Sequence, residues 1–376
     1  MLSCSVGGGW RRALSSNAPK RKRAVLFGYD GSAFAGSQSQ RNERTLDAPI
    51  DTVEDALHLA LFRAGGISPD NFTSLQKINW TRSSRTDRGV HAATQLVCAK
   101  LMIPNGVEDP ETGSVSRADE QAFCTTVNSF LPASIRVYRV QRVQGAFNAR
   151  HCTDSRRYSY FLPQTVLSTG NGLAEIQHLL DCFVGTHSFH NFTENVSPMD
   201  PRAMRYIKSF EAKQHSPGVI HLQVTGQSFL KHHIRRMVGL VVACLRTGQG
   251  RELVETALQP DRICTQLHSK MPFAPAEPLF LDMMFLDQYN AKMKLTSSKH
   301  EQINFCDEGV YGQTQALVRE VVLPTVFAKY QNAFDLWLES DNLASFPPAF
   351  VEANTVALEL REQKRKDSKV DYVRQR

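Results

Sequence analysis

The segment 82–92 places one carboxylate, Asp87, between two arginines, with a glycine two residues further on. Nearby positive charge favours the ionised form of an acid, and an aspartate before x-Gly suits a tight turn that its own side chain caps. Reactive side chains are often presented on loops. The pattern therefore indicates a candidate catalytic carboxylate. A turn aspartate in a surface ion pair is the alternative interpretation of the same residues.

A second group of candidate residues opens an apolar helix that the spacing predicts over about 230–245. Lys231 and Arg235 are four residues apart, as are His232 and Arg236, so each pair shares a helix face. Positive side chains at a helix N-terminus oppose the helix dipole, which favours a task such as pairing with an anion. A solvated basic face is the alternative.

A third feature is a concentration of arginine between Arg136 and Arg157, where six arginines accompany one acid. Tyr158 and Tyr160 follow directly. Arginine interleaved with aromatic rings suits contacts to phosphate and stacking on bases, so the pattern indicates an RNA-binding surface. An exposed, charged edge strand is the alternative.

The distribution of charge supports this local view of RNA binding. The 376-residue chain has a formal net charge of +7. Residues 1–23 carry six basic and no acidic side chains, and residues 361–376 have a net charge of +4. Removing both ends from the total of +7 leaves residues 24–360 at −3. Any RNA-binding surface must therefore come from local clusters.

Metal, redox and membrane roles find little support in the sequence. The eight cysteines are scattered singly without a C-x-x-C pair, which argues against a zinc ribbon or a redox dithiol and suits a reducing compartment. His187 and His190 lack a third ligand nearby, so no metal site is predicted. The apolar run 240–245 is too short to span a bilayer, which predicts a soluble protein without a membrane partner.

The order of strand and helix signals predicts the fold class. The first half shows a strand from Ala24, a helix over 53–64 capped by Thr52, and strands over 94–103 and 137–143. The second half repeats this order, with strands over 157–162 and 219–224 and helices over 176–183 and 230–245. Two such units without a G-x-G-x-x-G loop predict two α+β halves rather than a Rossmann domain. Residues 104–120 are interpreted as a surface insertion.

The same motifs resemble those of the TruA family of tRNA pseudouridine synthases. Residues 85–92, Arg-Thr-Asp-Arg-Gly-Val-His-Ala, match every fixed position of the family loop R-T-D-x-G-V-H-A. Residues 229–239 resemble F-[LM]-x-H-x-[IV]-R-x-[MI]-V-G, and residues 147–160 resemble F-x-A-R…R-x-Y-x-Y. The segment 29–38 resembles Y-D-G-x-x-[FY]-x-G-W-Q, with Ser37 in place of tryptophan, and 274–281 resembles A-P-x-x-G-L-x-L. These motifs occur in the family's order within residues 24–287.

The resemblance implies a role for each matched residue. Asp87 is the catalytic aspartate, Tyr158 stacks on the target base, and Arg235 pairs with Asp87. Arg85 fills the space left by the flipped base or binds the backbone. The remaining RNA-binding residues are expected to be Arg88, His91, Arg150, Arg157 and His232.

The family fold that the resemblance implies consists of two RNP-like α+β subdomains with joined antiparallel sheets around a central basic cleft. We expect an N-terminal subdomain at 24–145 that carries the Asp87 loop and a C-terminal subdomain at 146–289. Residues 290–376 are expected to form an extension outside the catalytic unit, with a helix at 327–338 and a charged tail. Residues 1–23 are interpreted as a targeting or disordered segment that fits a mitochondrial transit peptide; the run 20–23 fits a nuclear signal instead.

The function that the resemblance implies is isomerisation of uridine to pseudouridine in the anticodon stem or loop of tRNA. The partner is tRNA, no cofactor or metal is needed, and the protein is a monomer or a homodimer. A catalytically silent RNA-binding or coactivator protein with the same fold is the alternative. That alternative predicts the loss of Asp87, Tyr158 or Arg235, and all three are present.

Overall fold

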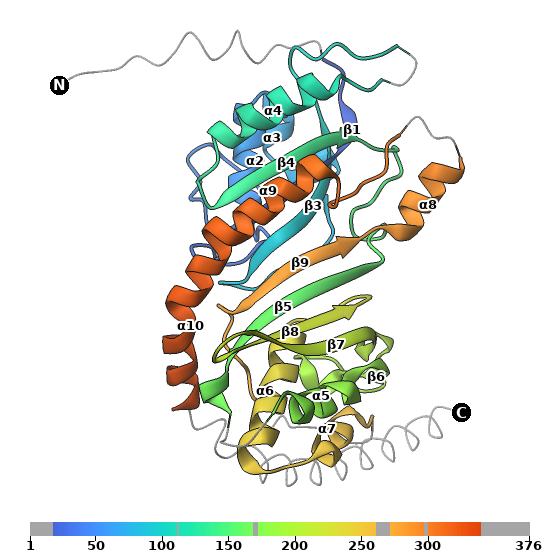
Figure 1. Ribbon diagram of the computed structural model, residues 1–376. Coiled ribbons are helices and arrows are strands. Elements are labelled where there is room, and N and C mark those ends of the chain that lie inside the picture. The colour runs from blue at the N-terminus through green and yellow to red at the C-terminus, as the bar shows by residue number, and fades with distance from the viewer. Residues whose placement is uncertain (1–17, 111–112, 168–171, 261–270, 297–299, 340–376) are drawn as a thin grey trace, which may run out of the picture. The chain divides into compact units, whose positions relative to one another are not determined.

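The computed structural model describes residues 18–110, 113–167, 172–260, 271–296 and 300–339 (Figure 1). The chain divides into two compact units. The first comprises Met1–Asp154 and Phe280–Thr325, and the second comprises Ser155–Leu279 and Val326–Arg376. The subdomain boundaries expected from the sequence stay a prediction; by its contacts, the segment 280–325 groups with the first unit.

The first unit is built on a mostly antiparallel sheet. Its strands are β1 (Arg21–Tyr29), β2 (Thr81–Arg82), β3 (His91–Leu101), β4 (Ile135–Arg142) and β9 (Leu279–Phe285), in the order β4-β1-β3-β9 with β2 also on β3. Only the β3–β9 pair, which aligns His91 with Phe280, is parallel. Ala24–Phe27 of β1 are all buried, so both faces of this central strand need cover.

Helices provide that cover in the first unit. The helices of this unit are α2 (Val53–Arg63), α3 (Pro69–Phe72), α4 (Arg117–Ser129), α8 (Asp287–Leu295) and α9 (Glu308–Leu317), with the short helix η1 (Leu75–Ile78) and the π-helix η6 (Val318–Val322). In Figure 1, α9 crosses the near side of the strands and α2 lies behind them. The predicted cap of α2 is confirmed, since Thr52 accepts a hydrogen bond from the Asp55 amide within a capping box.

The second unit has a four-stranded antiparallel sheet. Its strands are β5 (Ser155–Pro163), β6 (Gly185–Ser188), β7 (Met204–Ser216) and β8 (Val219–Gly226), in the order β5-β8-β7-β6. Its α-helices are α5 (Leu173–Leu180), α6 (His233–Thr247) and α7 (Arg251–Leu258). Helix α10 (Leu323–Leu338) begins in the first unit and continues in the second. The short helices of the second unit are η2 (Gln164–Val166), η3 (Asp181–Phe183), η4 (His190–Phe192) and η5 (Pro201–Ala203). The predicted α+β class with antiparallel sheets is confirmed.

Three predicted boundaries differ from the structure. Helix α6 begins at His233 rather than near Leu230, because His232 adopts the left-handed conformation with φ of 64°. Residues 117–120 of the predicted insertion are the first turn of α4, which Ser116 caps. The strand β1 begins at Arg21, inside the segment interpreted as targeting or disordered. Arg23 there is fully buried and pairs with Glu108. Residues 1–17 of the segment 1–23 that was interpreted as a transit peptide lie outside the described residues.

The described residues were expected to hold neither a membrane span nor a metal site. In the described ranges no helix combines the length and apolar character that a membrane span requires. The same part of the chain holds no group of three or more histidine, cysteine, aspartate and glutamate side chains placed to bind a metal ion.

A buried carboxyl group in the first unit gives the fold a pH dependence. Glu120 on α4 is 7% exposed and borders a cavity of about 270 Å³ that Arg117, Arg139 and Asp307 also line. Burial raises the pKa of Glu120 to about 7, although Arg117, Arg139 and Arg23 oppose the shift. The folded protein therefore holds a proton that the unfolded chain releases at lower pH, so this group lowers stability as pH rises toward 7.

Replacement of Glu120 by glutamine should remove this penalty. We expect Glu120→Gln to raise the free energy of unfolding at pH 8 by at most about 3.5 kcal/mol, at ~1.4 kcal/mol per pKa unit, with much less effect at pH 5. Thermal unfolding at the two pH values measures the difference, and Glu43→Gln, at an exposed position, is the control. An equal effect of Glu120→Gln at both pH values would contradict the assignment.

Candidate active site

Asp87 lies at the start of a tight turn between β2 and β3, as its sequence predicted. The Val90 amide donates to the Asp87 carbonyl at 3.2 Å. Gly89 has φ of +79°, whereas Arg88 is not among the residues with positive φ, so the turn is of type II. Asp87 is partly exposed, and the flanking Arg85 and Arg88 are exposed. The turn therefore presents a carboxylate between two exposed guanidinium groups.

Thr86, the residue before Asp87, forms hydrogen bonds through its amide, its carbonyl and its hydroxyl. The Thr86 amide donates to Ser37 Oγ at 2.8 Å, and the Ser37 amide donates to the Thr86 carbonyl at 3.1 Å. The Thr86 hydroxyl lies 2.7 Å from the Tyr29 hydroxyl. Ser37, the departure from the family motif, is 5% exposed and so anchors the Asp87 turn from within the protein.

The start of the loop is fixed by a second anchor, Gln95 on β3. Its carbonyl oxygen accepts from Ser83 Oγ at 2.5 Å, and its amide group donates to the Ser84 carbonyl at 3.4 Å. Arg85 lies between the two anchored ends and reaches Gln38 Oε1 with Nη1 at 3.3 Å. The loop backbone is thus restrained on both sides of Arg85, while its long side chain stays at the surface.

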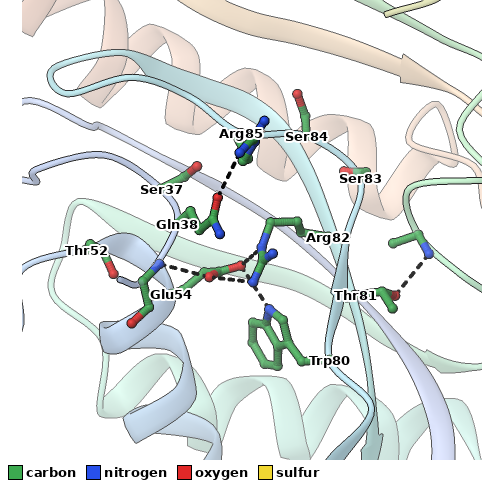
Figure 2. A network of polar contacts seen from close by, with 12 residues as sticks. Ser37, Gln38, Thr52, Glu54, Trp80, Thr81, Arg82, Ser83, Ser84 and Arg85 are labelled. Atoms are coloured by element: carbon green, nitrogen blue, oxygen red, sulfur yellow. Dashed lines mark hydrogen bonds and ion pairs between the residues drawn. The ribbon is translucent and has the colours of Figure 1, made fainter. Parts of the chain in front are cut away.

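The buried carboxylate of Glu54 forms hydrogen bonds with the segment 36–39 and with the residues around β2 (Figure 2). It is 3% exposed and accepts from Trp80 Nε1 at 2.9 Å and from the Ser39 amide at 3.0 Å. Arg82 donates to both of its oxygens, with Nη2 at 3.0 Å from Oε2. Sequence reasoning missed Glu54, although an acid on the apolar face of a predicted helix was a signal that could have revealed it.

The backbone of the same loop also meets the start of α2. The amides of Val53 and Glu54 donate to the carbonyls of Gly36 and Ser37 at 3.3 and 3.1 Å. These are amides that a helix N-terminus leaves without intrahelical partners. The segment 36–39 therefore connects the N-terminus of α2 to the Asp87 turn.

His91 lies behind the turn rather than on its surface. It is 1% exposed, and its Nδ1 is 2.8 Å from Asp30 Oδ1. Burial opposes ionisation of Asp30, but hydrogen bonds from His91 and from the Ser32 amide hold the pKa of Asp30 well below its usual range. Contact of His91 with RNA stays a prediction, and its burial favours a structural role.

In the second unit, Tyr158 is a buried residue of β5. It is 6% exposed, and its ring meets the Phe229 ring edge-on with centroids 5.2 Å apart. Tyr160, two residues on and on the same face, donates its hydroxyl to the Pro275 carbonyl at 3.1 Å. Arg157, between them, belongs to the opposite face and is partly exposed.

Arg235 is fixed by the segment that follows α7. Its Nε donates to the Ala274 carbonyl at 2.6 Å, and its own carbonyl accepts from the Ala274 amide at 3.1 Å. The guanidinium carbon lies 3.5 Å from the centroid of the Phe273 ring, a cation–π geometry. A Cβ at Gly239 would lie 2.3 Å from the Pro272 carbonyl oxygen, so this glycine allows the close approach that holds Arg235.

The basic residues at the start of α6 are compensated by an acidic side chain, Glu194. Glu194 lies 3.6 Å from Lys231 Nζ, 3.5 Å from His232 Nδ1 and 3.2 Å from Arg236 Nη2. Lys231 and His232 stand just before the helix, and Arg235 and Arg236 lie in its first turn, so the positive charge at this helix N-terminus is offset by Glu194. The family role of His232 beside the site stays a prediction.

The arginine-rich stretch from Arg136 to Arg157 is not a single basic surface, which corrects the interpretation from sequence. Arg139 is 8% exposed and forms ion pairs with Glu301 and Asp307. Arg156 is also buried and donates to the Gln227 carbonyl at 2.6 Å. Arg150 is exposed and Arg157 is partly exposed, so only part of the stretch can meet RNA. The acidic partners of Arg139 come from residues about 165 positions away, beyond the reach of local patterns.

The predicted site residues therefore fall into two groups. Asp87, Arg85, Arg88, His91 and Arg150 belong to the first unit, whereas Tyr158, Arg235, Arg157 and His232 belong to the second. Within the first unit, the loop brings Asp87, Arg85 and Arg88 together. The pairing of Asp87 with Arg235 stays a prediction.

The turn geometry generates a first test of this site. Gly89→Ala places a Cβ at a positive φ, so it should destabilise the protein by about 1 kcal/mol. Gly145→Ala is the matched control, because a Cβ there meets nothing within 4 Å and Gly145 has no positive φ. Urea unfolding measures both, and equal effects of the two substitutions would contradict the turn assignment.

Known proteins with similar sequences agree with the motifs. The family model described as tRNA pseudouridine synthase matches residues 180–285. The chain is 30% identical to the pseudouridylate synthase 1 homolog of Homo sapiens, over 86% of this chain and 73% of that protein. It is 29% identical to the Mus musculus protein of the same name, over 91% and 78%, and 29% identical to the tRNA pseudouridine(27/28) synthase of Saccharomyces cerevisiae, over 72% and 85%. The chain belongs to the TruA family of tRNA pseudouridine synthases.

Proposed function

We propose that this protein isomerises uridine to pseudouridine in the anticodon arm of tRNA, with Asp87 as the catalytic carboxylate. The observation that carries the proposal is the type II turn that presents Asp87 between the exposed Arg85 and Arg88. The names of the relatives, pseudouridylate synthase 1 and tRNA pseudouridine(27/28) synthase, support the reaction and the substrate. The presence of Asp87, Tyr158 and Arg235 disfavours a catalytically silent protein.

The reaction needs one group that can act on the sugar and a place for the detached base. The bond between N1 of uracil and C1′ of the ribose breaks, the base turns, and a new bond joins C5 to C1′. C5 then loses its hydrogen and N1 gains one, so the product is an isomer. Because the reacting bond lies inside the RNA, the nucleotide must leave its stack first.

Asp87 can serve this reaction by two routes. Its carboxylate either attacks C1′ and is displaced later by C5, or removes the hydrogen from C2′ to give a glycal to which the base then adds. Both routes need the ionised carboxylate. We infer that Arg235 stabilises this form, that the Tyr158 ring stacks on the flipped base, and that Arg85 binds the RNA where the base has left.

Removal of the carboxylate tests the assignment. Asp87→Asn should abolish pseudouridine formation while the dissociation constant for tRNA stays within about twofold, because the substitution preserves shape and removes the reactive group. Release of tritium from C5 of labelled uridine in tRNA measures turnover, and filter binding measures affinity. Asp47→Asn, at an exposed position, is the control. Turnover by Asp87→Asn at the rate of the control would overturn the proposal.

The yeast relative's name suggests positions 27 and 28 as the target uridines. A tRNA transcript with cytidine at both positions should therefore lose all product, whereas one with substituted uridines outside the anticodon arm should keep it. Mapping of pseudouridine along each transcript makes the measurement. Full product on the first transcript would move the target elsewhere in tRNA.

The cellular location, mitochondrial or nuclear, and the oligomeric state, monomer or homodimer, are proposals separate from the catalytic one. The mitochondrial interpretation rests on residues 1–17, which lie outside the described residues. The nuclear interpretation rests on the run 20–23, of which Arg21–Arg23 belong to β1, and it stays a proposal.

A further inference from the structure

The C-terminal segment 308–325 packs on the sheet that carries the catalytic turn. Helix α9 contacts β1, β3 and β4, and it crosses these strands in Figure 1. Leu317 is 4% exposed, and a Cβ at Gly28 would lie only 2.6 Å from its Cδ2. The sheet surface therefore has a recess at Gly28 into which the Leu317 side chain fits.

The π-helix η6 sets which residues of this segment face the sheet. The buried residues of the segment are Val310, Thr314, Leu317 and Val322. Their spacing is four, three and five, and the interval of five coincides with η6 at Val318–Val322. A π-helical turn inserts one extra residue into a helix. Thr325, three residues after Val322, consequently lies on the same side of the helix as the buried positions.

Thr325 reaches the carboxylate behind the catalytic turn. Its Oγ1 lies 3.1 Å from Asp30 Oδ2 and 2.9 Å from the Val321 carbonyl oxygen, so its single hydroxyl proton serves one of the two at a time. The other oxygen of Asp30 accepts from the Ser32 amide at 2.9 Å and lies 2.8 Å from His91 Nδ1. Asp30 is 8% exposed, which makes the loss of a partner costly.

Asp30 in turn restrains the exit of the catalytic turn. A Cβ at Gly31 would lie 2.1 Å from the Val90 carbonyl oxygen, so the turn after β1 is in close backbone contact with Val90. His91, the partner of Asp30, is four residues from Asp87. The contacts therefore run from Thr325 through Asp30 and His91 to the end of the turn, while Ser37 and Tyr29 hold its start.

We propose that the segment 308–325 positions the catalytic turn, with Thr325 as the positioning residue. This inference rests on the proposed function. Sequence reasoning assigned the segment to an extension outside the catalytic unit, and the family model match ends at residue 285. On this proposal, the segment acts on the catalytic loop through Asp30 and His91.

The test compares three full-length variants. Thr325→Val removes the hydroxyl at nearly constant shape, and Thr325→Ser retains it. Thr256→Val is the matched control, because the Thr256 hydroxyl donates to the Glu252 carbonyl one turn earlier, as Thr325 does to Val321. Single-turnover rate constants at saturating enzyme, tRNA dissociation constants and hydrogen exchange of the Thr86 and Val90 amides are measured for each.

We expect Thr325→Val to lower the single-turnover rate constant about three- to tenfold, which corresponds to the loss of one buried hydrogen bond. Its tRNA dissociation constant should not change, and the Thr86 and Val90 amides should exchange faster. Thr325→Ser and Thr256→Val should match the wild type. A Thr325→Val protein with the rate and exchange of the wild type, or with the same loss as Thr256→Val, would overturn the inference. A wild-type protein that forms no pseudouridine refutes the proposed function instead, and the exchange measurement still decides the positioning role.

Discussion

The turn that carries Asp87 depends on hydrogen bonds to Thr86, the residue before Asp87. The Asp87 carboxylate is partly exposed, so the geometry of its type II turn depends on the residues that hold the turn backbone. Here the Ser37 hydroxyl accepts a hydrogen bond from the Thr86 amide, and the Tyr29 hydroxyl is hydrogen-bonded to the Thr86 hydroxyl. Both partners are buried, which excludes water from competing for these groups.

The remaining structure around the loop serves the same constraint. The N-terminus of α2 holds the carbonyls of residues 36 and 37, and the buried Glu54 binds Arg82 and the Ser39 amide. Such a network stabilises the loop only when every member is paired, because a buried carboxylate that loses its partner destabilises the folded protein. Arg85 and Arg88 remain exposed on this supported loop.

Much of this arrangement follows from local sequence. The Asp-x-Gly pattern predicted the turn, Thr52 predicted the cap of α2, and apolar periodicity predicted most strands and helices, because each depends on neighbours in the chain. The features that sequence could not supply are long-range. Arg139 is neutralised by Glu301 and Asp307, and Asp30 meets Thr325 from almost three hundred residues away. Position 37 shows a further limit: tryptophan, the usual family residue, can only donate a hydrogen bond through its side chain, so the acceptor role of Ser37 could not be inferred from the motif.

The central claim is that anchoring of Thr86 positions Asp87 for chemistry, and a double-mutant cycle of Ser37→Ala and Tyr29→Phe tests it most directly. Each single substitution should lower the single-turnover rate of pseudouridine formation about three- to tenfold, with an unchanged tRNA dissociation constant. The double variant should lose less than the product of the two effects, since both side chains hold the same residue. Single-turnover rates equal to that of the wild type in both single variants would contradict the account.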